Sequence, residues 1–565
     1  MSLFGTIQQS ANALQVNQLG LHVTGNNIAN ANTPGYIRQE LLQSTVAGVR
    51  IGGVILGYGV RAAGVVQKLD NFVVERLRET SSSLASAEAQ VEANSQIEAF
   101  FNELSDTGFN SRLADFSNAI QDVLNQPGND SIRRLVIERG KTLTSELRSM
   151  RGRLDNLATA VDSEISSSVG EINRLTNRIA ELNTRIVELE GGRLGTSDAV
   201  GLRDERLSVL SDLAKLIDIR AVEQESGSVT VFVGGEYLVA DGIKRDVAYG
   251  LTSDGEESYP EVRLADTDSP LQISAGRLHG LYTMRRETSQ RLISDLDQYA
   301  NDIITQFNQI HSQGQGISGF SEVTGTFASD DPTAPLDLAG LAAEIKNGSF
   351  EVLVRDKNTG LTTTQNIRIQ LTGGVNDTSL EDVKNALDAI SGLSATITAE
   401  GKLRISADTT RLEFAFQNDH SNFLAAAGIN TFFVGDSAAN IAINDVVAND
   451  PQKFAASLSG ISTDTQNALR LAAAFDEPLE GLGDRSFKQA FEDIVIRTSQ
   501  DINVQAGLAD GLRNFYNTLE AQHLAASGVN LDEEAVKMIF YQRAFQASSK
   551  LIQTTSEMLE VLVNL

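Results

Sequence analysis

The 565-residue sequence contains no cysteine, which excludes disulfides, thiolate nucleophiles and sulfur metal ligands together. This composition fits a secreted bacterial surface protein, although it leaves the redox compartment open. Basic residues are scarce as well: 46 Lys and Arg stand against 74 Asp and Glu, for a net charge of −28. Such a chain would repel nucleic acid and anionic membranes, so neither is an expected partner.

Long apolar runs are also missing. No segment approaches the ~18–20 consecutive apolar residues that a membrane helix needs, so we expect no membrane insertion. Residues 1–21 lack the basic region and the uninterrupted apolar region of a secretory signal peptide. If the protein is exported, we expect export without a cleaved signal peptide.

The patterns of metal sites and enzyme active sites are not found. The histidines show neither an i, i+4 pair nor an HExxH motif, so they predict no metal site and no catalytic residue. They are His22, His279, His311, His420 and His523. We therefore predict that the chain is not an enzyme and has no catalytic residues, no cofactor and no metal.

One glycine-rich segment matches GxGxxG through Gly314, Gly316 and Gly319. It follows a predicted helix instead of a strand, the reverse of a dinucleotide site. We interpret it as a flexible exit from a helical bundle. The acidic pairs 256–257 and 330–331 lie in polar connecting sequence and are interpreted as solvated loop carboxylates.

The composition that is present is that of a folded protein. Hydrophobic residues make up 41% and charged residues 21% of the chain, as in ordinary globular domains. At about 150 residues per domain, the length corresponds to about three or four domains.

The two ends of the chain share one apolar spacing. Apart from His22, the first charged side chain is Arg38, and the residues before it are rich in Gln, Asn, Ala and Leu. Apolar residues recur every seven positions there and again after Asn530, which can cap a helix to which Glu533 reaches back. We predict two helices that pair through these narrow seams, although each seam could instead dock on its own domain. The seam residues are Ile7, Leu14, Leu21, Ile28, Met538, Phe545, Ile552 and Leu559.

Long periodic segments between the ends predict a helical bundle. A coiled-coil-like helix is indicated by steps of three and four residues through Ile172, Leu175, Ile179, Leu182, Ile186 and Leu189. Its expected partners are periodic segments at 73–120, 292–310 and 487–524. Because these segments are far apart in sequence, the bundle must be discontinuous.

Two regions read as β structure. Val229, Val231 and Val233 alternate before Gly234 and Gly235, which predicts a hairpin with residues 237–239. From about residue 319 further alternating segments follow at 350–354, 367–371, 395–399, 403–405 and 412–416, with a short helix opened by Ser379 and Asp382. This part predicts an inserted α+β domain.

The expected fold is mainly α. It is an elongated discontinuous helical bundle with paired N- and C-terminal coiled-coil helices, a small β-hairpin insertion and an inserted α+β, β-rich outer domain. We place a terminal inner domain at 1–60 and 525–565, and the bundle at 61–320 and 445–524 with the hairpin at about 220–272. The outer domain is placed at 321–444.

Residues 26–36 read NNIANANTPGY, which physically is a helix ending in an Asn-rich segment and a Pro-Gly turn. As a string, it resembles the N-terminal motif of the flagellar axial proteins, the rod, hook and hook-associated components. The C-terminal YQRAFQASSKLI resembles the other half of the motif of that family. The matching positions singled out are Asn26, Asn27, Ile28, Asn30, Pro34, Gly35, Tyr36, Tyr541, Gln542 and Phe545.

Within this family, the length, the TVFVGGEYLV hairpin and SAGRLHGL (274–281) resemble the hook-associated members that join hook to filament. The resemblance implies an extracellular structural subunit of the flagellum, exported by a type III channel, whose ends become ordered on assembly. Its implied partners are copies of itself, the hook protein, a second junction protein or flagellin, and an export chaperone on the C-terminal helix.

Three alternatives stay open at this point. The chain could be another axial component, a hook or distal rod protein. It could be an axial protein with a wall-hydrolase activity in the 321–444 insert. An adhesin or an unrelated secreted coiled-coil protein would share the periodicity and the acidity, but would have no reason to carry the 26–36 motif.

Overall fold

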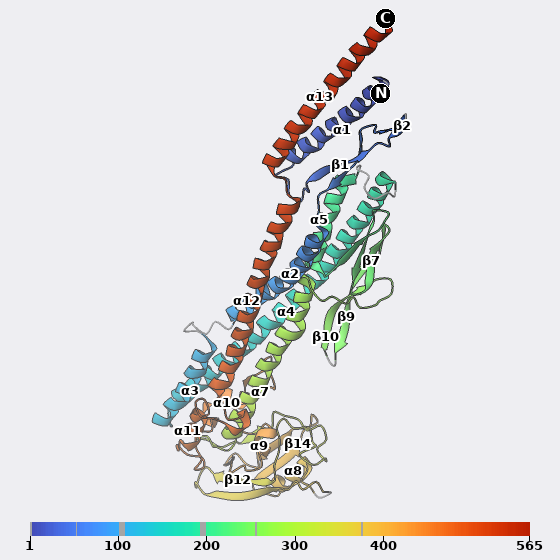
Figure 1. Cartoon of the computed structure of the whole chain (residues 1–565). Helices are drawn as coiled ribbons and strands as arrows, with labels where there is room; N and C mark the ends of the chain where they lie inside the picture. Colours follow the sequence, from blue (N-terminus) through green and yellow to red (C-terminus); the bar gives the residue numbers. More distant parts are fainter. Residues whose placement is uncertain are drawn as a thin grey trace. The chain divides into compact units, whose positions relative to one another are not determined.

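The computed structural model describes residues 3–51, 54–100, 108–191, 199–254, 257–374 and 377–564. The chain forms two compact units, each built from separate stretches of sequence (Figure 1). Unit 1 contains Met1–Ala93, Ala160–Glu287 and Asn503–Leu565, and unit 2 contains Asn94–Thr159 and Thr288–Ile502. The fold is mainly helical with several small sheets, which confirms the predicted class. The predicted domain limits stay a prediction, because each unit combines segments from more than one predicted domain.

Unit 1 is built mainly from long helices. The apolar pattern in the C-terminal half of α4 is confirmed, since Ile172, Ile179 and Ile186 are fully buried. Leu189 departs from this buried pattern. It is 52% exposed, because the helix ends one residue later. The helices that contribute to unit 1 are α1 (Leu3–Ala29), α2 (Asn71–Phe100), α4 (Asp130–Glu190), α5 (Val200–Leu216), α6 (Arg277–Thr283), α12 (Phe487–Ser527) and α13 (Leu531–Val563).

The predicted hairpin in unit 1 is present and belongs to a larger β region. Its turn uses Gly234 and Gly235, which have φ of +55° and +90°, a conformation that favours glycine. β5 (Arg220–Glu223), β6 (Val229–Val233), β7 (Glu236–Ala240) and β8 (Ile243–Lys244) form one antiparallel sheet. The other antiparallel pairs are β1 (Gln39–Thr45) with β4 (Val60–Gln67), β2 (Val49–Ile51) with β3 (Val54–Leu56), and β9 (Val247–Asp254) with β10 (Glu257–Leu264).

The helical part of unit 2 surrounds an aromatic core. Phe116 lies with its ring centroid 5.6 Å from the rings of both Phe307 and Phe432, so helices and loops far apart in sequence share one core. The helices are α3 (Phe109–Asn125), α7 (Gln290–His311), α8 (Leu380–Asp388), α9 (Phe423–Ala426), α10 (Asp445–Asn449) and α11 (Gln466–Ala473). The short 3₁₀ turns of unit 2 are η3 (Pro451–Lys453) and η4 (Glu480–Leu482), and the π-helical η2 (Met284–Ser289), which begins in unit 1, precedes α7.

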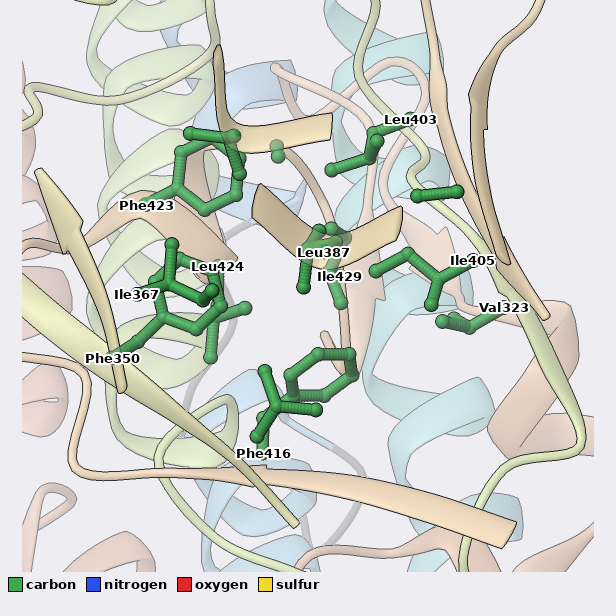
Figure 2. Close-up of a cluster of buried hydrophobic side chains, with 14 of the residues drawn as sticks. Val323, Phe350, Ile367, Leu387, Leu403, Ile405, Phe416, Phe423, Leu424 and Ile429 are labelled. Carbon is green, nitrogen blue, oxygen red and sulfur yellow. The ribbon is translucent and has the colours of Figure 1, made fainter. Parts of the chain in front are cut away.

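The inserted β region of unit 2 has its own apolar core, shown in Figure 2. Phe350 stacks on Phe423 at 5.4 Å, and Leu387 of α8 is fully buried in the same cluster. α8 begins after Ser379, as predicted, and Ser379 and Asp382 form a capping box there. The strands are β11 (Glu322–Thr324), β12 (Gly348–Asp356), β13 (Thr362–Ile369), β14 (Leu393–Ile397), β15 (Leu403–Ala407), β16 (Leu412–Gln417), β17 (Phe433–Val434) and β18 (Ala442–Ile443). The sheet orders are β13-β12-β16, β11-β15-β14 and β17-β18.

The glycine-rich segment after α7 is tightly packed, so its interpretation as a flexible exit is wrong. A Cβ atom at Gly314 would lie 2.8 Å from the Ala455 carbonyl oxygen, and one at Gly316 would lie 2.1 Å from the Gln452 carbonyl oxygen. These glycines allow two backbone segments to approach each other. The backbone N–H of Ile317 donates to the same Gln452 oxygen at 3.0 Å.

Candidate assembly interface

The two terminal helices lie side by side in unit 1, as Figure 1 shows. α1 and α13 contact each other extensively. Gly20 of α1 faces the ring of Tyr541 in α13, and a Cβ atom at Gly20 would lie 2.6 Å from that ring. Only glycine therefore allows this close approach. Tyr541 is one of the C-terminal motif residues, so part of that motif acts in pairing the ends of the chain.

The N-terminal motif meets α13 through Asn27. Its buried amide oxygen accepts from the Tyr36 hydroxyl at 2.8 Å and from the Gln39 N–H at 3.0 Å. Its Nδ2 donates to the Gln39 carbonyl at 2.9 Å and to Glu534 Oε2 at 3.0 Å. Asn27 thus joins the end of α1 to the start of β1 and to the first turn of α13.

Arg38 completes this arrangement. Its buried guanidinium donates from Nε to Glu534 Oε1 at 2.9 Å and pairs with Glu533 at 2.7 Å. Its backbone N–H donates to the Ser527 carbonyl at the end of α12 at 2.9 Å. We call Asn27, Tyr36, Arg38, Gln39 and Glu534 the connector network, because they link both ends of the chain to the rest of unit 1.

The electrostatics of the connector network favour an ionised Glu534. Burial alone would raise the pKa of this carboxyl, but hydrogen bonds from Asn27 and Arg38 hold the pKa of Glu534 below its ordinary value. Burial raises the pKa of Tyr36 to about 12, so its hydroxyl stays a proton donor to Asn27. The network is therefore a buried ion pair with its polar atoms supplied with partners, the condition under which such a pair is tolerated.

The predicted cap of α13 forms, but one of its two parts is wrong. Asn530 Oδ1 accepts from the N–H groups of Asp532 and Glu533 at 3.0 and 3.3 Å, as expected of an N-cap. The Glu533 side chain does not reach back to the cap. It pairs with Arg38, because the buried guanidinium needs negative charge.

The remaining motif residues end α1 and turn the chain. Asn30 Nδ2 donates to Asn26 Oδ1 at 2.9 Å, and Gly35 has φ of +76° in the turn before β1. Pro34 and Gln542 are exposed, while Ile28 and Phe545 are half-buried. The motif thus combines a helix terminator with the connector network.

The predicted seam residues occupy intermediate positions. All eight are half-buried in the single chain: Ile7, Leu14, Leu21, Ile28, Met538, Phe545, Ile552 and Leu559. Their role in assembly stays a prediction. Sequence reasoning missed Val16 and Val23, the buried apolar residues of α1, which pack with Leu41 and Val65 of the β1–β4 pair. Their own spacing of seven was available as a signal, but the β1–β4 pair was not predicted.

A second apolar face of α13 is exposed. Phe540 is 66% and Met558 60% exposed, whereas the buried residues of this helix are polar, Glu534 and Thr555. Large apolar side chains on an exposed helix face are typical of a protein–protein contact. The exposed set is Val536, Ile539, Phe540, Leu551, Met558, Val561 and Leu562.

Two of the groups considered for chemistry, His311 and Asp331, are held by hydrogen bonds to the backbone. His311 is fully buried between the Asn430 carbonyl and the Ala455 N–H, and Asp331 Oδ1 accepts from the Thr333 N–H. The acidic pair at 256–257 lies outside the side chains that the structure describes. Within the described ranges no group of three His, Asp or Glu residues could hold a metal ion. None of the described helices combines the length and apolar composition that crossing a membrane requires.

Three family models match this chain. Residues 94–326 match the flagellar hook-associated protein FlgK helical domain. Residues 7–36 match the flagella basal body rod protein family, and residues 520–565 match the C-terminal region of the flagellar basal body rod FlgEFG proteins. The two terminal matches contain α1 from Ile7 onward, the turn up to Tyr36, and all of α13, so they include the helices that pair in unit 1.

Relatives also match over nearly the whole chain. Flagellar hook-associated protein 1 of Escherichia coli (strain K12) is 24% identical over 573 residues, covering 99% of each chain. The protein of that name from Bacillus subtilis (strain 168) is 24% identical over 605 residues, covering 100% of this chain and 98% of the relative. A solved structure, the flagellar hook junction protein FlgK from Burkholderia pseudomallei, has 16% identity and a TM-score of 0.48, and covers 79% of this chain and 99% of that one. Over its full length, the chain thus resembles flagellar hook-associated protein 1.

Proposed function

We propose that the chain is a structural subunit of the bacterial flagellum that forms the junction between hook and filament by helical self-assembly. The observation that carries this proposal is the full-length match to flagellar hook-associated protein 1, combined with the pairing of the two motif-bearing ends. As an axial component, the chain works by assembly with other flagellar components.

The paired ends are the proposed assembly interface. In an open helical assembly, one face of each subunit contacts a different face of its neighbour, so every subunit needs two complementary surfaces. α13 offers an exposed apolar face, and the seam residues remain half-buried in the single chain. Contacts with neighbouring subunits would complete the burial of both sets and supply the free energy of assembly.

This arrangement gives each predicted domain a position. The terminal helices form the inner layer, the bundle forms the next layer, and the 321–444 insert faces solvent. The separate apolar core of the insert is consistent with a role outside the inner layer.

Partners and export follow from the same interface. We infer contacts with copies of the chain, with the hook protein on one side, and with a second junction protein or flagellin on the other. An export chaperone would cover the exposed apolar face of α13 before assembly, because such a face is prone to non-specific association. Export is through the type III channel to the cell exterior.

Deletion of the gene tests the proposal, with electron microscopy of the cells as the readout. The expected result is hooks that lack filaments. Cells without hooks would instead indicate a rod or hook component, and normal flagella would refute a role in assembly. Zymography of the purified full chain on cell-wall material tests the alternative of a wall hydrolase, and we expect no cleared zone.

A further inference from the structure

A pocket of about 480 Å³ in unit 1 has a lining unlike the rest of this acidic chain. Four arginines line it, Arg78, Arg203, Arg206 and Arg220, together with the two acidic residues Glu75 and Glu223. The formal balance of its charged lining is therefore +2, from four minus two. The whole chain carries −28.

Two of these arginines are already paired. Arg203 donates from Nε and Nη2 to the two oxygens of Glu190, both at 2.8 Å. Arg206 Nη1 donates to Asn183 Oδ1 at 2.9 Å and to the Gly227 carbonyl at 2.7 Å. Glu223 pairs with both Arg203 and Arg206, so its charge does not neutralise Arg78 or Arg220.

The other two arginines have no such partner. The Nε atom of Arg78 is buried and meets no hydrogen-bond acceptor in the described part of the chain. Arg220 stacks on the Phe232 ring at 5.3 Å, and it forms no ion pair with any residue that the structure describes. A buried N–H group without an acceptor, such as Arg78 Nε, is costly, and Arg220 is exposed beside it, so the pocket is suited to an incoming anion.

We propose that this arginine pocket receives an Asp or Glu side chain from a second copy of the chain. A carboxylate fits the planar fork of a guanidinium through two parallel hydrogen bonds. The excess of acidic residues makes another copy electrostatically complementary to the pocket. The inference rests on the proposed function, because it requires neighbouring copies.

Site-specific photo-crosslinking in cells tests the proposal. Benzoylphenylalanine replaces Val222, a pocket residue that is 38% exposed, or Ile243 as a control outside the pocket in the same sheet. The expected result is a crosslinked dimer from position 222. The double variant Arg78→Gln with Arg220→Gln should lower the yield of the crosslinked dimer by at least about tenfold. This is the change expected for one lost charged hydrogen bond. Arg174→Gln, which removes an exposed arginine elsewhere in unit 1, should leave the yield unchanged.

Several results would overturn the assignment. One is that flagella form normally while position 222 crosslinks only to another protein or to nothing. Another is that the double variant of Arg78 and Arg220 gives the same yield of crosslinked dimer as the native chain. Stabilisation of the purified monomer by phosphate without any dimer crosslink would indicate a free anion and would also overturn it. Circular dichroism checks that the double variant folds. If the double variant does not fold, the single variant Arg220→Gln, which changes an exposed position, is used in its place. The gene-deletion phenotype does not depend on the pocket. Failure of the proposed function can therefore be distinguished from failure of the pocket proposal.

Discussion

At the scale of single residues, the connector network assigns roles to motif positions that look interchangeable in sequence. Asn27 and Asn30 are both asparagines in one helix end, yet Asn27 is buried with four hydrogen bonds and Asn30 binds only within the turn. Glu533 and Glu534 are neighbours that both reach Arg38, but Glu534 is 1% exposed and Glu533 is 58% exposed. The buried member of each pair, Asn27 and Glu534, is therefore the one that connects the ends of the chain.

Glu534→Gln should weaken the pairing of the chain ends by about 3 kcal/mol, because it leaves Arg38 buried beside a neutral amide. The measurement is the fraction of secreted chain that is incorporated into flagella, with secretion assayed separately. We expect this fraction to fall by at least about tenfold. Glu533→Gln is the matched control and should have a much smaller effect, and equal effects of the two changes would contradict this role of Glu534.

His311 should make unit 2 sensitive to acid. Burial lowers its pKa to about 4, and the neutral ring donates from Nδ1 to the Asn430 carbonyl and accepts at Nε2 from the Ala455 N–H. The unfolded chain binds a proton near pH 6.5 and the folded chain only near pH 4. This group's contribution to stability is therefore present above about pH 6.5 and decreases by about 3 kcal/mol as pH falls to 4.

Denaturant unfolding between pH 7.5 and 4 checks this prediction. His311→Gln should be less stable at neutral pH but should lose less stability on acidification than the native chain does. His22→Gln, at an exposed position of α1, is the control and should keep the native pH profile. Identical pH profiles for the native chain and His311→Gln would contradict the role of this residue.

The residue roles were only partly predictable from sequence. The 26–36 motif predicted the helix end and the turn, because glycine, proline and asparagine have strong local preferences. The contact between Asn27 and Glu534 joins residues 507 positions apart. No local preference contains that information, so the sequence alone could not assign Asn27 its buried position.

At the scale of elements, the closeness of α1 and α13 depends on Gly20. Gly20→Ala should raise the intrinsic preference for helix by about 1 kcal/mol, yet overpacking against Tyr541 costs about 1–3 kcal/mol. We expect a net loss and incorporation into flagella reduced severalfold. Gly25→Ala in the same helix has no atom within 4 Å of the added Cβ and should maintain or increase incorporation. The opposite order of the two variants would contradict close packing at Gly20.

Elements were predicted well where periodicity is strong and poorly where it is weak. The long helices and the strands of the insert follow from clear apolar patterns, and α4 and β12 lie where expected. β1 and β4 carry exposed and buried residues without a regular alternation, and their pairing contains a register shift between Leu42 and Gln43. This irregularity hid the β1–β4 pair and, with it, the surface on which Val16 and Val23 pack.

At the scale of the whole molecule, the ends of the chain combine features that a self-contained domain does not need. α1 and α13 pair through a glycine contact and the hydrogen bond from Asn27 to Glu534, while α13 leaves a face of large apolar side chains exposed. Burying each such side chain stabilises by about 1.5–3 kcal/mol. We therefore assign the specificity of pairing to the connector network and the free energy of assembly to contacts with neighbouring subunits.

The most direct test of this account is complementation of the deletion strain with Leu14→Asp combined with Phe545→Asp. The control is Gln15→Asp with Ser549→Asp, which adds the same charges at exposed positions of the same two helices. Filaments are counted by electron microscopy, and the secreted chain is measured separately. We predict hooks without filaments for the seam variant despite normal secretion, and normal filaments for the control. Normal filaments in cells that carry the seam variant would contradict the assignment of the terminal helices as the assembly interface.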